Sequence, residues 1–469
     1  MKNLTLENIA LAVKGTYHGP EDSRKFEILS VTTDSRKAEA GCLFVPIVGE
    51  RADGHSFIPQ VIAAGAACVL SERELENPSF PWIQVASTLQ AVKDLAAFYL
   101  DQLNIPVVGV TGSVGKTSTK EMIASVLSQK YATLKTLGNF NNELGLPLTV
   151  FRLREEEIAV LEMGINHFGE MSRLAAVAKP DTAVITNIGT CHLEFLQDRD
   201  GVLKAKTELL PFIRPQGHIV FNGNDDKLCT VSGYGDIPAQ YYGLPEEKKA
   251  SFLSVWADQI EDKGFGGTDA LIHLEKSREV FPVHIPVPGR HMVMNALAAA
   301  AVGEIYGLSP AQIQAGIENV KALEGRFHLI QTDRFRIVDD CYNASPLSMK
   351  GSLDILRTGA GRRVAILGDM GELGKDEVSL HREVGAYAAQ SGIDTVVFVG
   401  KLAMEMAEAA RQTKEDGKPL VYWEPSVEAL TEKLASYVQD DDTILVKASH
   451  FMHFERVLEA LRQAGRRYI

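Results

Sequence analysis

The chain has 469 residues, 45% of them hydrophobic, and a formal net charge of -13 at pH 7. This length exceeds what one hydrophobic core serves, so we expect two or three domains of roughly 100 to 200 residues each. The acidic balance argues against a nucleic-acid binder, because neutralising phosphates requires clustered basic charge. The five cysteines are scattered and lack CxxC spacing, which argues against a disulfide framework or a structural zinc site.

No segment reaches the ~20 apolar residues that a bilayer-spanning helix needs. Residues 1–15 form a short amphipathic pattern without the unbroken apolar core of a secretory signal. We therefore expect a cytoplasmic protein with no membrane partner. We also expect a monomer, although the sequence holds no direct information on oligomeric state.

The first part of the chain predicts a small α/β domain over residues 1–103. Short apolar runs at 42–47, 67–70 and 82–85 alternate with helical segments, and a helix is predicted over 88–103. Asn104 and Pro106 then interrupt the pattern, which marks a domain boundary.

Residues 104–324 predict a second domain with a mostly parallel sheet. A β-branched run at 106–110 is followed by strand-like runs separated by segments long enough for crossover helices, at 158–161, 182–185 and 218–221. Residues 251–288 favour an antiparallel patch, and 295–306 an Ala-rich helix. Gly325 is the expected hinge to the next domain.

Residues 325–469 predict a third, Rossmann-like domain, because the alternation of strands and helices restarts. The expected strands lie at 335–338, 363–367, 395–399, 420–422 and 443–446. The predicted fold class is therefore α/β with three domains: a small N-terminal α/β domain, a central P-loop domain and a Rossmann-like C-terminal domain.

The strongest motif is a strand-like run into Gly-Ser-Val-Gly-Lys-Thr and then a helix. Two glycines let backbone N–H groups converge on phosphate oxygens, a lysine faces the β- and γ-phosphates, and a threonine hydroxyl can ligate Mg²⁺. Val110 departs from the standard GxxxxGK[ST] spacing, and the alternative is an ordinary glycine turn with a capping threonine. We expect nucleotide binding by Gly112, Ser113, Gly115, Lys116, Thr117 and Ser118.

A P-loop enzyme also needs an acid at the end of a neighbouring strand to hold its metal. Glu162 closes the apolar run 158–161 and is the candidate, acting directly or through water. The alternative is a merely solvated carboxylate. The absence of an NKxD element argues against guanine recognition, so ATP is the expected nucleotide and Mg²⁺ the expected metal.

Several further stretches resemble the Mur ligases, across all three predicted domains. They are Gly138 to Glu143, Leu161 to Gly164 with Asn166 and His167, His192 to Glu194, Ala205 to Glu208, Gly289 to His291 with Asn295, Gly325 to Arg326, Asp339 to Pro346, and Leu367 to Gly374. The combination NxNNE, DDxYNAxP and LGDMGELG is most similar to the family branch that adds D-alanyl-D-alanine to UDP-N-acetylmuramoyl tripeptide, with ATP and Mg²⁺.

The resemblance implies a role for particular residues. Lys116 and Thr117 hold the triphosphate and its Mg²⁺, and Glu162 and His192 serve the metal sites, so His192 joins Lys116 among the expected catalytic residues. His291 and Asn295 lie near adenine, and Arg326 and Asp340 near the ribose and phosphates; taken singly, each also has an ordinary structural explanation. Asn141, Asn142 and Asn343 are implied substrate residues.

Lys206 is implied to be a catalytic lysine, carbamylated by CO₂ to give an anionic ligand for a second Mg²⁺. The residues alone do not choose between Lys204 and Lys206, which lie two apart on one predicted helix. The Ala-Lys-x-Glu pattern of the family selects Lys206. The alternative is a solvated helix lysine.

Two N-terminal loops resemble the family's UDP-sugar-binding loops, and arginine beside hydroxyls suits a diphosphate. The substrate residues expected there are Ser35, Arg36, Arg51, Asp53 and His55. Two departures from the family pattern are Cys191, where a small residue is usual, and His450, where arginine is common.

The expected activity is ATP-dependent amide-bond formation through an acyl phosphate. The alternatives are another Mur ligase, a folylpolyglutamate synthase-like ligase, or a P-loop switch that hydrolyses ATP without these substrates. The third residue of the tripeptide is not readable from the sequence.

Overall fold

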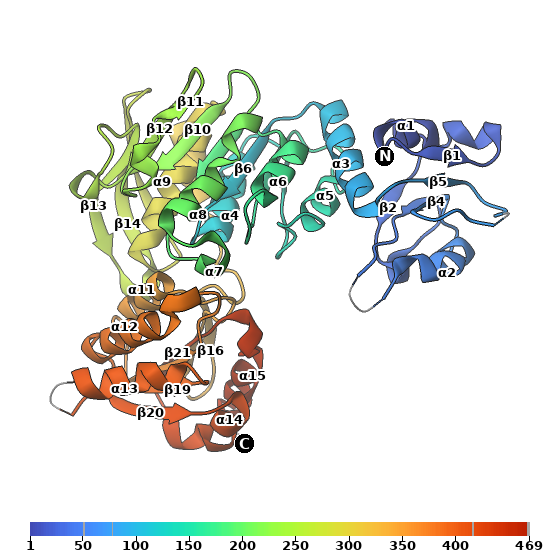
Figure 1. Ribbon diagram of the computed structural model, residues 1–469. Coiled ribbons are helices and arrows are strands. Elements are labelled where there is room, and N and C mark those ends of the chain that lie inside the picture. The colour runs from blue at the N-terminus through green and yellow to red at the C-terminus, as the bar shows by residue number, and fades with distance from the viewer. Residues whose placement is uncertain (50–51, 77, 415–416, 467–469) are drawn as a thin grey trace.

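The computed structural model describes residues 1–49, 52–76, 78–414 and 417–466. The described residues form three separate sheets, with helices packed around each (Figure 1). The first sheet lies in the blue N-terminal part, the second in the middle of the chain and the third in the orange and red C-terminal part. The predicted three-domain α/β class is confirmed, whereas the boundaries at 103/104 and 324/325 stay a prediction.

The N-terminal sheet has the order β1-β5-β4-β3-β2, with β1 antiparallel to β5 and the other pairs parallel. Its strands are β1 (Thr16–His18), β2 (Ser30–Thr32), β3 (Cys42–Phe44), β4 (Cys68–Ser71) and β5 (Trp82–Gln84), and its helices include α1 (Leu6–Ala12) and α2 (Ile58–Ala63). The first two strands escaped sequence prediction because each is only three residues long and carries no buried residue.

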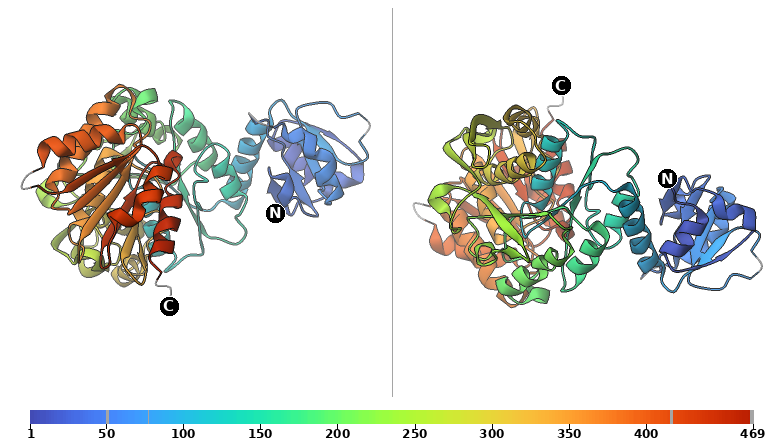
Figure 2. Two further views of the ribbon diagram at one scale, coloured as in Figure 1. Left: turned by 90° about the horizontal axis from the view of Figure 1, so that it is seen from below. Right: turned by 90° about the horizontal axis from the view of Figure 1, so that it is seen from above.

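Helix α3 (Thr88–Leu103) joins the N-terminal sheet to the rest of the molecule. It begins where the Ser87 side chain accepts from Gln90 N and ends at Asn104, whose φ of 49° is left-handed. It packs against α1 on one side and against α5 (Gly145–Val150) and α6 (Glu170–Ala178) of the central domain on the other. Figure 2 shows the N-terminal part standing to one side, connected through this helix.

The central sheet has the order β15-β14-β13-β12-β10-β9-β6-β8-β7, with β11 beside β12. It is parallel from β7 to β13 and antiparallel over β13 to β15, as the apolar pattern predicted. The strands are β6 (Val107–Thr111), β7 (Thr133–Lys135), β8 (Ile158–Glu162), β9 (Thr182–Ile185), β10 (His218–Asn222), β11 (Gly233–Tyr234), β12 (Ile237–Gly243), β13 (Val255–Asp262), β14 (Thr268–Leu274) and β15 (Glu279–Ile285).

Helices cover this sheet and position the phosphate loop. Helix α4 (Lys116–Leu127) follows β6, an interior strand of the parallel part, and packs against α9 (Arg290–Ile305). The other helices are α7 (Leu193–Leu196), α8 (Arg199–Thr207) and α10 (Pro310–Glu318). The Ala-rich helix predicted over 295–306 is present as α9, which begins five residues earlier; its N-cap is Gly289, at φ 112°, with no side-chain cap that the sequence would reveal.

The C-terminal sheet has the order β16-β17-β21-β18-β19-β20 and is parallel except for the β16–β17 pair. Its strands are β16 (His328–Gln331), β17 (Arg336–Asp339), β18 (Arg363–Gly368), β19 (Thr395–Val399), β20 (Leu420–Glu424) and β21 (Thr443–Lys447). Its helices are α11 (Pro346–Leu356), α12 (Glu377–Gln390), α13 (Ala403–Thr413), α14 (Val427–Tyr437) and α15 (Glu455–Ala464). Across the described parts of the chain, no helix combines the length and apolar character needed to cross a membrane.

Candidate active site

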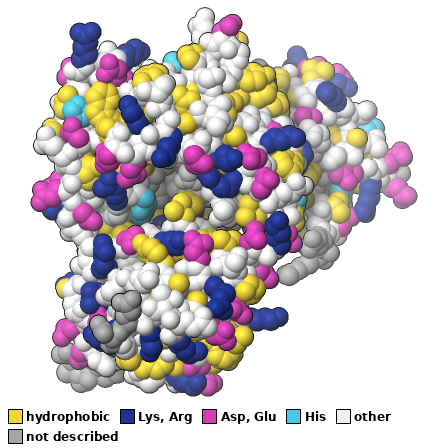
Figure 3. Space-filling view, turned by 60° about the vertical axis from the view of Figure 1, so that its left-hand side comes forward, with side chains coloured by type: hydrophobic (Ala, Val, Ile, Leu, Met, Phe, Trp, Pro, Cys, Tyr) yellow, Lys and Arg dark blue, Asp and Glu magenta, His cyan; other side chains and the backbone are white. Residues whose placement is uncertain are grey.

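A cavity of about 1860 Å³ lies between the central and C-terminal domains. Figure 3 shows the hollow between the larger upper body and the lower body of the molecule. Its walls are the loop after β6, the carboxyl ends of β8 and β10, the start of α9, and residues of the C-terminal domain from Gly325 to Arg357 and from Lys447 to Phe451. Polar groups from two domains therefore face one space.

Two glycines and Asn187, a residue that the sequence analysis did not single out, fix the conformation of the phosphate loop. A Cβ on Gly112, at φ 151°, would lie 1.9 Å from Thr186 Oγ1, and Gly115, at φ 81°, is the N-cap of α4. The backbone N–H of Val114 donates to Asn187 Oδ1 at 2.9 Å, and that of Ser113 to Asn187 O at 3.0 Å. The N-terminus of α4 is left facing the cavity, which suits a phosphate.

Lys116 and Ser118 both line this cavity. Lys116 Nζ donates to Gly112 O at 2.8 Å, so its ammonium group curls back over the loop. That position places one positive charge at the helix N-terminus, where a triphosphate would need it.

Glu162 and Thr117 form a buried acid–hydroxyl pair beside the loop. Glu162 Oε1 accepts from Thr117 Oγ1 at 3.2 Å and from Asn141 Nδ2 at 2.8 Å. Its other oxygen, Oε2, is buried and has no hydrogen-bond partner in the described structure, and the nearest cation, Lys120 Nζ, lies 3.9 Å away. A buried carboxylate oxygen without a hydrogen-bond partner, beside a hydroxyl, is a ligand set that suits Mg²⁺.

The described residues contain no group of three or more His, Cys, Asp and Glu side chains placed to hold a metal. Magnesium keeps several waters and commonly binds through one or two carboxylates plus substrate phosphates. The Glu162 and Thr117 pair is therefore compatible with magnesium and not with a structural zinc site.

Lys206 is buried in α8, whereas Lys204 is exposed and lies 5.7 Å from the Phe168 ring centroid. Burial lowers the pKa of Lys206 to about 8; nearby Cys191 opposes this shift and the charge of Lys116 adds to it. The structure therefore separates the two lysines that the residues alone left equivalent. Neither the carbamate nor the metal role of Lys206 is tested by this geometry.

His192 lies between the two domains. Its Nδ1 is 2.5 Å from Glu372 Oε2 of the LGDMGELG segment, and this contact lowers the pKa of Glu372. Both residues have left-handed backbones, with φ of 53° and 60°. Because its described partner is Glu372, His192 is placed to link the domains, and its metal role stays a prediction.

The two predicted adenine residues occupy the first turns of α9 and line the cavity. Asn295 is buried, its Oδ1 accepts from Thr119 Oγ1 at 2.9 Å, and its Nδ2 donates to Met292 Sδ at 3.2 Å. It therefore ties α9 to the phosphate-loop helix in addition to facing the cavity. His291 is exposed at the start of the same helix.

Arg326 brings the C-terminal domain to the phosphate loop. Its guanidinium carbon lies 4.3 Å from the ring centroid of Tyr342, and Nη2 donates to Thr117 Oγ1 at 3.0 Å. The Tyr342 ring holds the planar guanidinium of Arg326 by a cation–π contact, and the guanidinium N–H groups face the phosphate loop.

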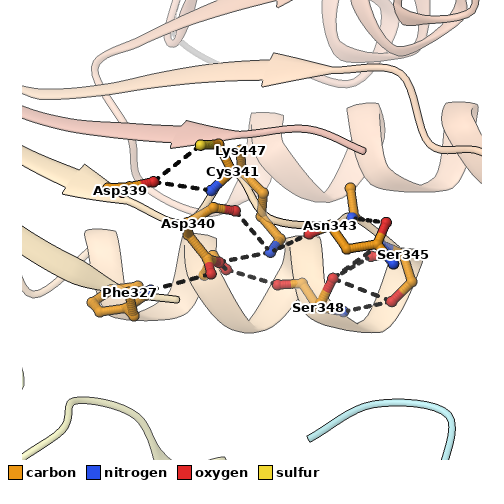
Figure 4. A network of polar contacts seen from close by, with 10 residues as sticks. Phe327, Asp339, Asp340, Cys341, Asn343, Ser345, Ser348 and Lys447 are labelled. Carbon is orange, nitrogen blue, oxygen red and sulfur yellow. Dashed lines mark hydrogen bonds and ion pairs between the residues drawn. The ribbon is translucent and has the colours of Figure 1, made fainter. Parts of the chain in front are cut away.

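Asp340 lies in a polar network that also contains Lys447, which the sequence analysis did not single out (Figure 4). Asp340 Oδ2 accepts from Lys447 Nζ and from Ser352 Oγ, both at 2.6 Å. Lys447 Nζ also donates to Asn343 O at 3.1 Å and is buried at the end of β21. The signal for Lys447 was its place at the end of a buried parallel strand, where sites of this fold gather.

The predicted substrate asparagines are all at the cavity wall. Asn141 holds Glu162, as described above. Asn142 Oδ1 accepts from Gly145 N at 2.8 Å at the start of α5, and Asn343 Oδ1 accepts from Ala344 N at 2.8 Å. The side-chain oxygens of these last two therefore fix loops.

The N-terminal candidates do not line this cavity. Arg36 forms two hydrogen bonds with Asp34, at 2.9 and 2.8 Å, and these bonds lower the pKa of Asp34 to about 2. His55 Nδ1 lies 2.7 Å from Asp53 Oδ1. Ser35 begins a short 3-10 helix, and Arg51 lies outside the described residues. Their role as a UDP-sugar site stays a prediction.

Comparison with known proteins agrees with this geometry. The chain matches the Mur ligase middle domain over residues 110–303, the Mur ligase glutamate ligase domain over 325–450 and the Mur ligase family catalytic domain over 27–111. The chain belongs to the Mur ligase family, whose members are ATP-dependent, amide-bond-forming ligases.

Individual relatives indicate which branch of the family the chain resembles. The UDP-N-acetylmuramoyl-tripeptide–D-alanyl-D-alanine ligase of Bacillus subtilis (strain 168) is 39% identical over 468 residues, covering 97% of this chain and 98% of the relative. The crystal structure of MurF from Acinetobacter baumannii is 32% identical, covers 98% of each chain and has a TM-score of 0.88. MurF ligase from Thermotoga maritima in complex with ADP is 29% identical over 92% of this chain and 97% of that one, with a TM-score of 0.79.

Proposed function

We propose that this protein joins D-alanyl-D-alanine to UDP-N-acetylmuramoyl tripeptide in peptidoglycan precursor synthesis. The observation that carries the proposal is 39% identity to a ligase of that name, extending over nearly the whole of both chains. The site supports it, because a phosphate loop and groups of the C-terminal domain line one cavity large enough for several substrates.

The chemistry requires that a peptide carboxylate be activated. ATP transfers its γ-phosphoryl group to that carboxylate, ADP leaves, the dipeptide amine attacks the acyl phosphate, and phosphate is released. We assign Lys116 and Arg326 to the triphosphate, where they would offset the negative charge that shifts during phosphoryl transfer; their contacts with the phosphate loop support this. His291 and Asn295 are assigned to the adenine side, and Asp340 with Lys447 supports the loop that carries Tyr342 and Asn343.

We assign Mg²⁺ to Thr117 and Glu162, with His192 and Lys206 serving a second metal position. The bound metal supplies charge neutralisation for the phosphoryl group. Glu162 Oε2, which has no hydrogen-bond partner in the described structure, and the buried Lys206 are both costly to bury otherwise, and they support this assignment. Carbamylated Lys206 would contribute the anionic oxygen that a neutral or cationic lysine lacks.

We assign residues 1–103 to UDP-sugar binding, 104–324 to ATP binding and 325–469 to the C-terminal Rossmann-like domain. Ser35, Arg36, Arg51, Asp53 and His55 are the proposed diphosphate and sugar contacts. Further expectations are a cytoplasmic location, a monomer, and no nucleic-acid or membrane partner.

The test is to incubate the purified protein with ATP, Mg²⁺, UDP-N-acetylmuramoyl tripeptide and D-alanyl-D-alanine. The expected result is the pentapeptide product by mass, with one phosphate released per bond formed. Omitting the dipeptide or the tripeptide should abolish both signals. Phosphate release that is the same with and without the two substrates, and that yields no product, would instead establish a P-loop ATPase switch. A product formed only with glutamate or a single amino acid would favour a different ligase of the family.

A further inference from the structure

An ion-paired cluster outside the expected catalytic residues connects helix α3 to the segment that contacts Glu162, the proposed metal carboxylate. Lys93 of α3 lies 2.8 Å from Glu143 Oε2, and Arg173 of α6 lies 2.7 Å from Glu143 Oε1. Glu143 belongs to the asparagine-rich segment that lines the cavity. Three elements that are separate in the sequence therefore meet at one carboxylate.

The two basic partners differ in burial. The side chain of Lys93 is only 8% exposed, whereas that of Arg173 is 46% exposed. Burial alone would raise the pKa of Glu143, but its hydrogen bonds with Arg173 and Lys93 lower it. A buried lysine is costly unless it is paired, so Lys93 depends on Glu143 more than Arg173 does.

Glu143 anchors a segment that contacts Glu162, the proposed metal carboxylate, through Asn141. Asn141, two residues earlier, donates from Nδ2 to Glu162 Oε1, and its backbone oxygen accepts from Gly164 N at 2.9 Å. A Cβ on Gly164 would lie 2.9 Å from Asn141 Cγ, so Asn141 fits closely against the residues after β8. Glu162 Oε1 is thereby occupied, and Oε2 is the oxygen left for a cation.

We propose that Lys93 is a positioning residue for the magnesium site: through Glu143 it holds Asn141 on Glu162 Oε1 and so orients Oε2. The inference rests on the proposed Mg²⁺ role of Glu162. Mutation of a residue that orients a metal ligand typically changes metal affinity 10- to 100-fold. Lys93 acts less directly, because Glu143 and Asn141 lie between it and the ligand Glu162. Because α3 also packs on α1, this contact links the placement of the N-terminal domain to the metal carboxylate.

The test measures ADP affinity calorimetrically with saturating Mg²⁺ and with EDTA, which does not require the ligase reaction. In the wild type Mg²⁺ should tighten ADP binding. In Lys93→Met this Mg²⁺-dependent tightening should fall by about tenfold, with affinity in EDTA unchanged. Lys93→Arg should restore most of it. Glu143→Gln, which keeps the side-chain shape, should reproduce the loss, and Arg173→Met should lose less.

The matched control is Lys179→Met, which removes another ion pair between α3 and the end of α6, that of Lys179 with Asp101. It should leave both affinities unchanged. In an Asn141→Ala background, Lys93→Met should cause no further loss, because the two act in series. Wild-type tightening in Lys93→Met, an equal loss in Lys179→Met, or additive losses with Asn141→Ala would overturn the proposal.

Failures of the two proposals are distinguishable. A wild type that shows Mg²⁺-dependent ADP binding but makes no pentapeptide would overturn the proposed substrate while leaving the role of Lys93 intact. A wild type without any Mg²⁺-dependent tightening would overturn both the metal assignment and the role of Lys93.

Discussion

Arg326 Nη2 donates a hydrogen bond to Thr117 Oγ1 at 3.0 Å, across 209 positions of sequence. The bond joins the start of the C-terminal domain to the first turn of the phosphate-loop helix. The hydroxyl that it contacts also donates to Glu162. One threonine therefore lies between Glu162, the proposed metal ligand of the central domain, and the arginine of the C-terminal domain.

Arg326→Ala should lower maximal turnover by about a hundredfold or more, because it removes a preorganised positive group facing the phosphates. Steady-state phosphate release in the presence of all three substrates measures this. Tyr342→Phe keeps the ring under the guanidinium and should stay within a few-fold of wild type. If Arg326→Ala changes turnover no more than Tyr342→Phe does, the arginine has no role at the phosphates.

Lys116→Ala should abolish pentapeptide formation, since it removes the charge that faces the γ-phosphoryl group. Product by mass at saturating ATP is the measurement. Lys130→Ala is a suitable control, because that exposed lysine donates to Gly307 O away from the cavity and should leave turnover unchanged. Near-normal turnover in Lys116→Ala would refute the phosphate-loop assignment.

Lys206→Ala should lose most ligase activity and regain part of it when a short carboxylic acid is added to replace the missing oxygen ligand. With its pKa lowered to about 8, Lys206 has far more neutral amine near pH 7 than an ordinary lysine of pKa ~10.4, and only the neutral amine reacts with CO₂. Lys204→Ala, at an exposed position of the same helix, should be much milder. Full activity in Lys206→Ala, or an equal loss of activity in Lys206→Ala and Lys204→Ala, would contradict carbamylation of Lys206.

Asn295→Ala should raise the ATP concentration needed for half-maximal rate more than it lowers maximal turnover, as expected when uniform nucleotide binding is lost. The contact with Thr119 adds a second expectation: the buried hydroxyl loses its acceptor, which costs about 1 to 3 kcal/mol of stability. Thermal unfolding without nucleotide separates the two effects. An unchanged ATP dependence with reduced stability would leave Asn295 a structural residue only.

Asp394 should make the stability of the C-terminal domain sensitive to acid. Burial alone would raise its pKa, but Arg363 and Lys418 bind its carboxylate and lower the pKa to about 2. A lowered folded-state pKa gives stability that is present above the unfolded pKa near 4 and is lost as the pH falls toward 2. This amounts to about 2 kcal/mol at most.

The measurement is denaturant unfolding of wild type and Asp394→Asn at pH 7 and pH 3. The stability difference between them should be largest at pH 7 and shrink at pH 3. A difference independent of pH would show that the Asp394 charge contributes nothing to folding.

Sequence alone predicted the fold class well because its long parallel strands are buried on both faces and read as unbroken apolar runs, as in Thr395–Val399. It missed β1 and β2, whose three residues each are only half buried or exposed. For the site, a local motif located Lys116 and Thr117. Asn187 acts through a contact with a distant segment, which no local pattern marks. Lys447 had a signal in its place at the end of a buried strand, but its partner Asp340 lies far away in the sequence.

The distance in sequence between Thr117 and Arg326 also has a consequence for how the protein is made. Domains fold broadly in the order of their synthesis, so the phosphate loop and Glu162 can be in place while the ribosome is still adding the last third of the chain. At that stage the loop has its own lysine but not the arginine that contacts it from the C-terminal domain. A nascent chain at that stage has the phosphate loop but neither Arg326 nor the C-terminal wall of the cavity, so the complete site forms only after the third sheet has folded.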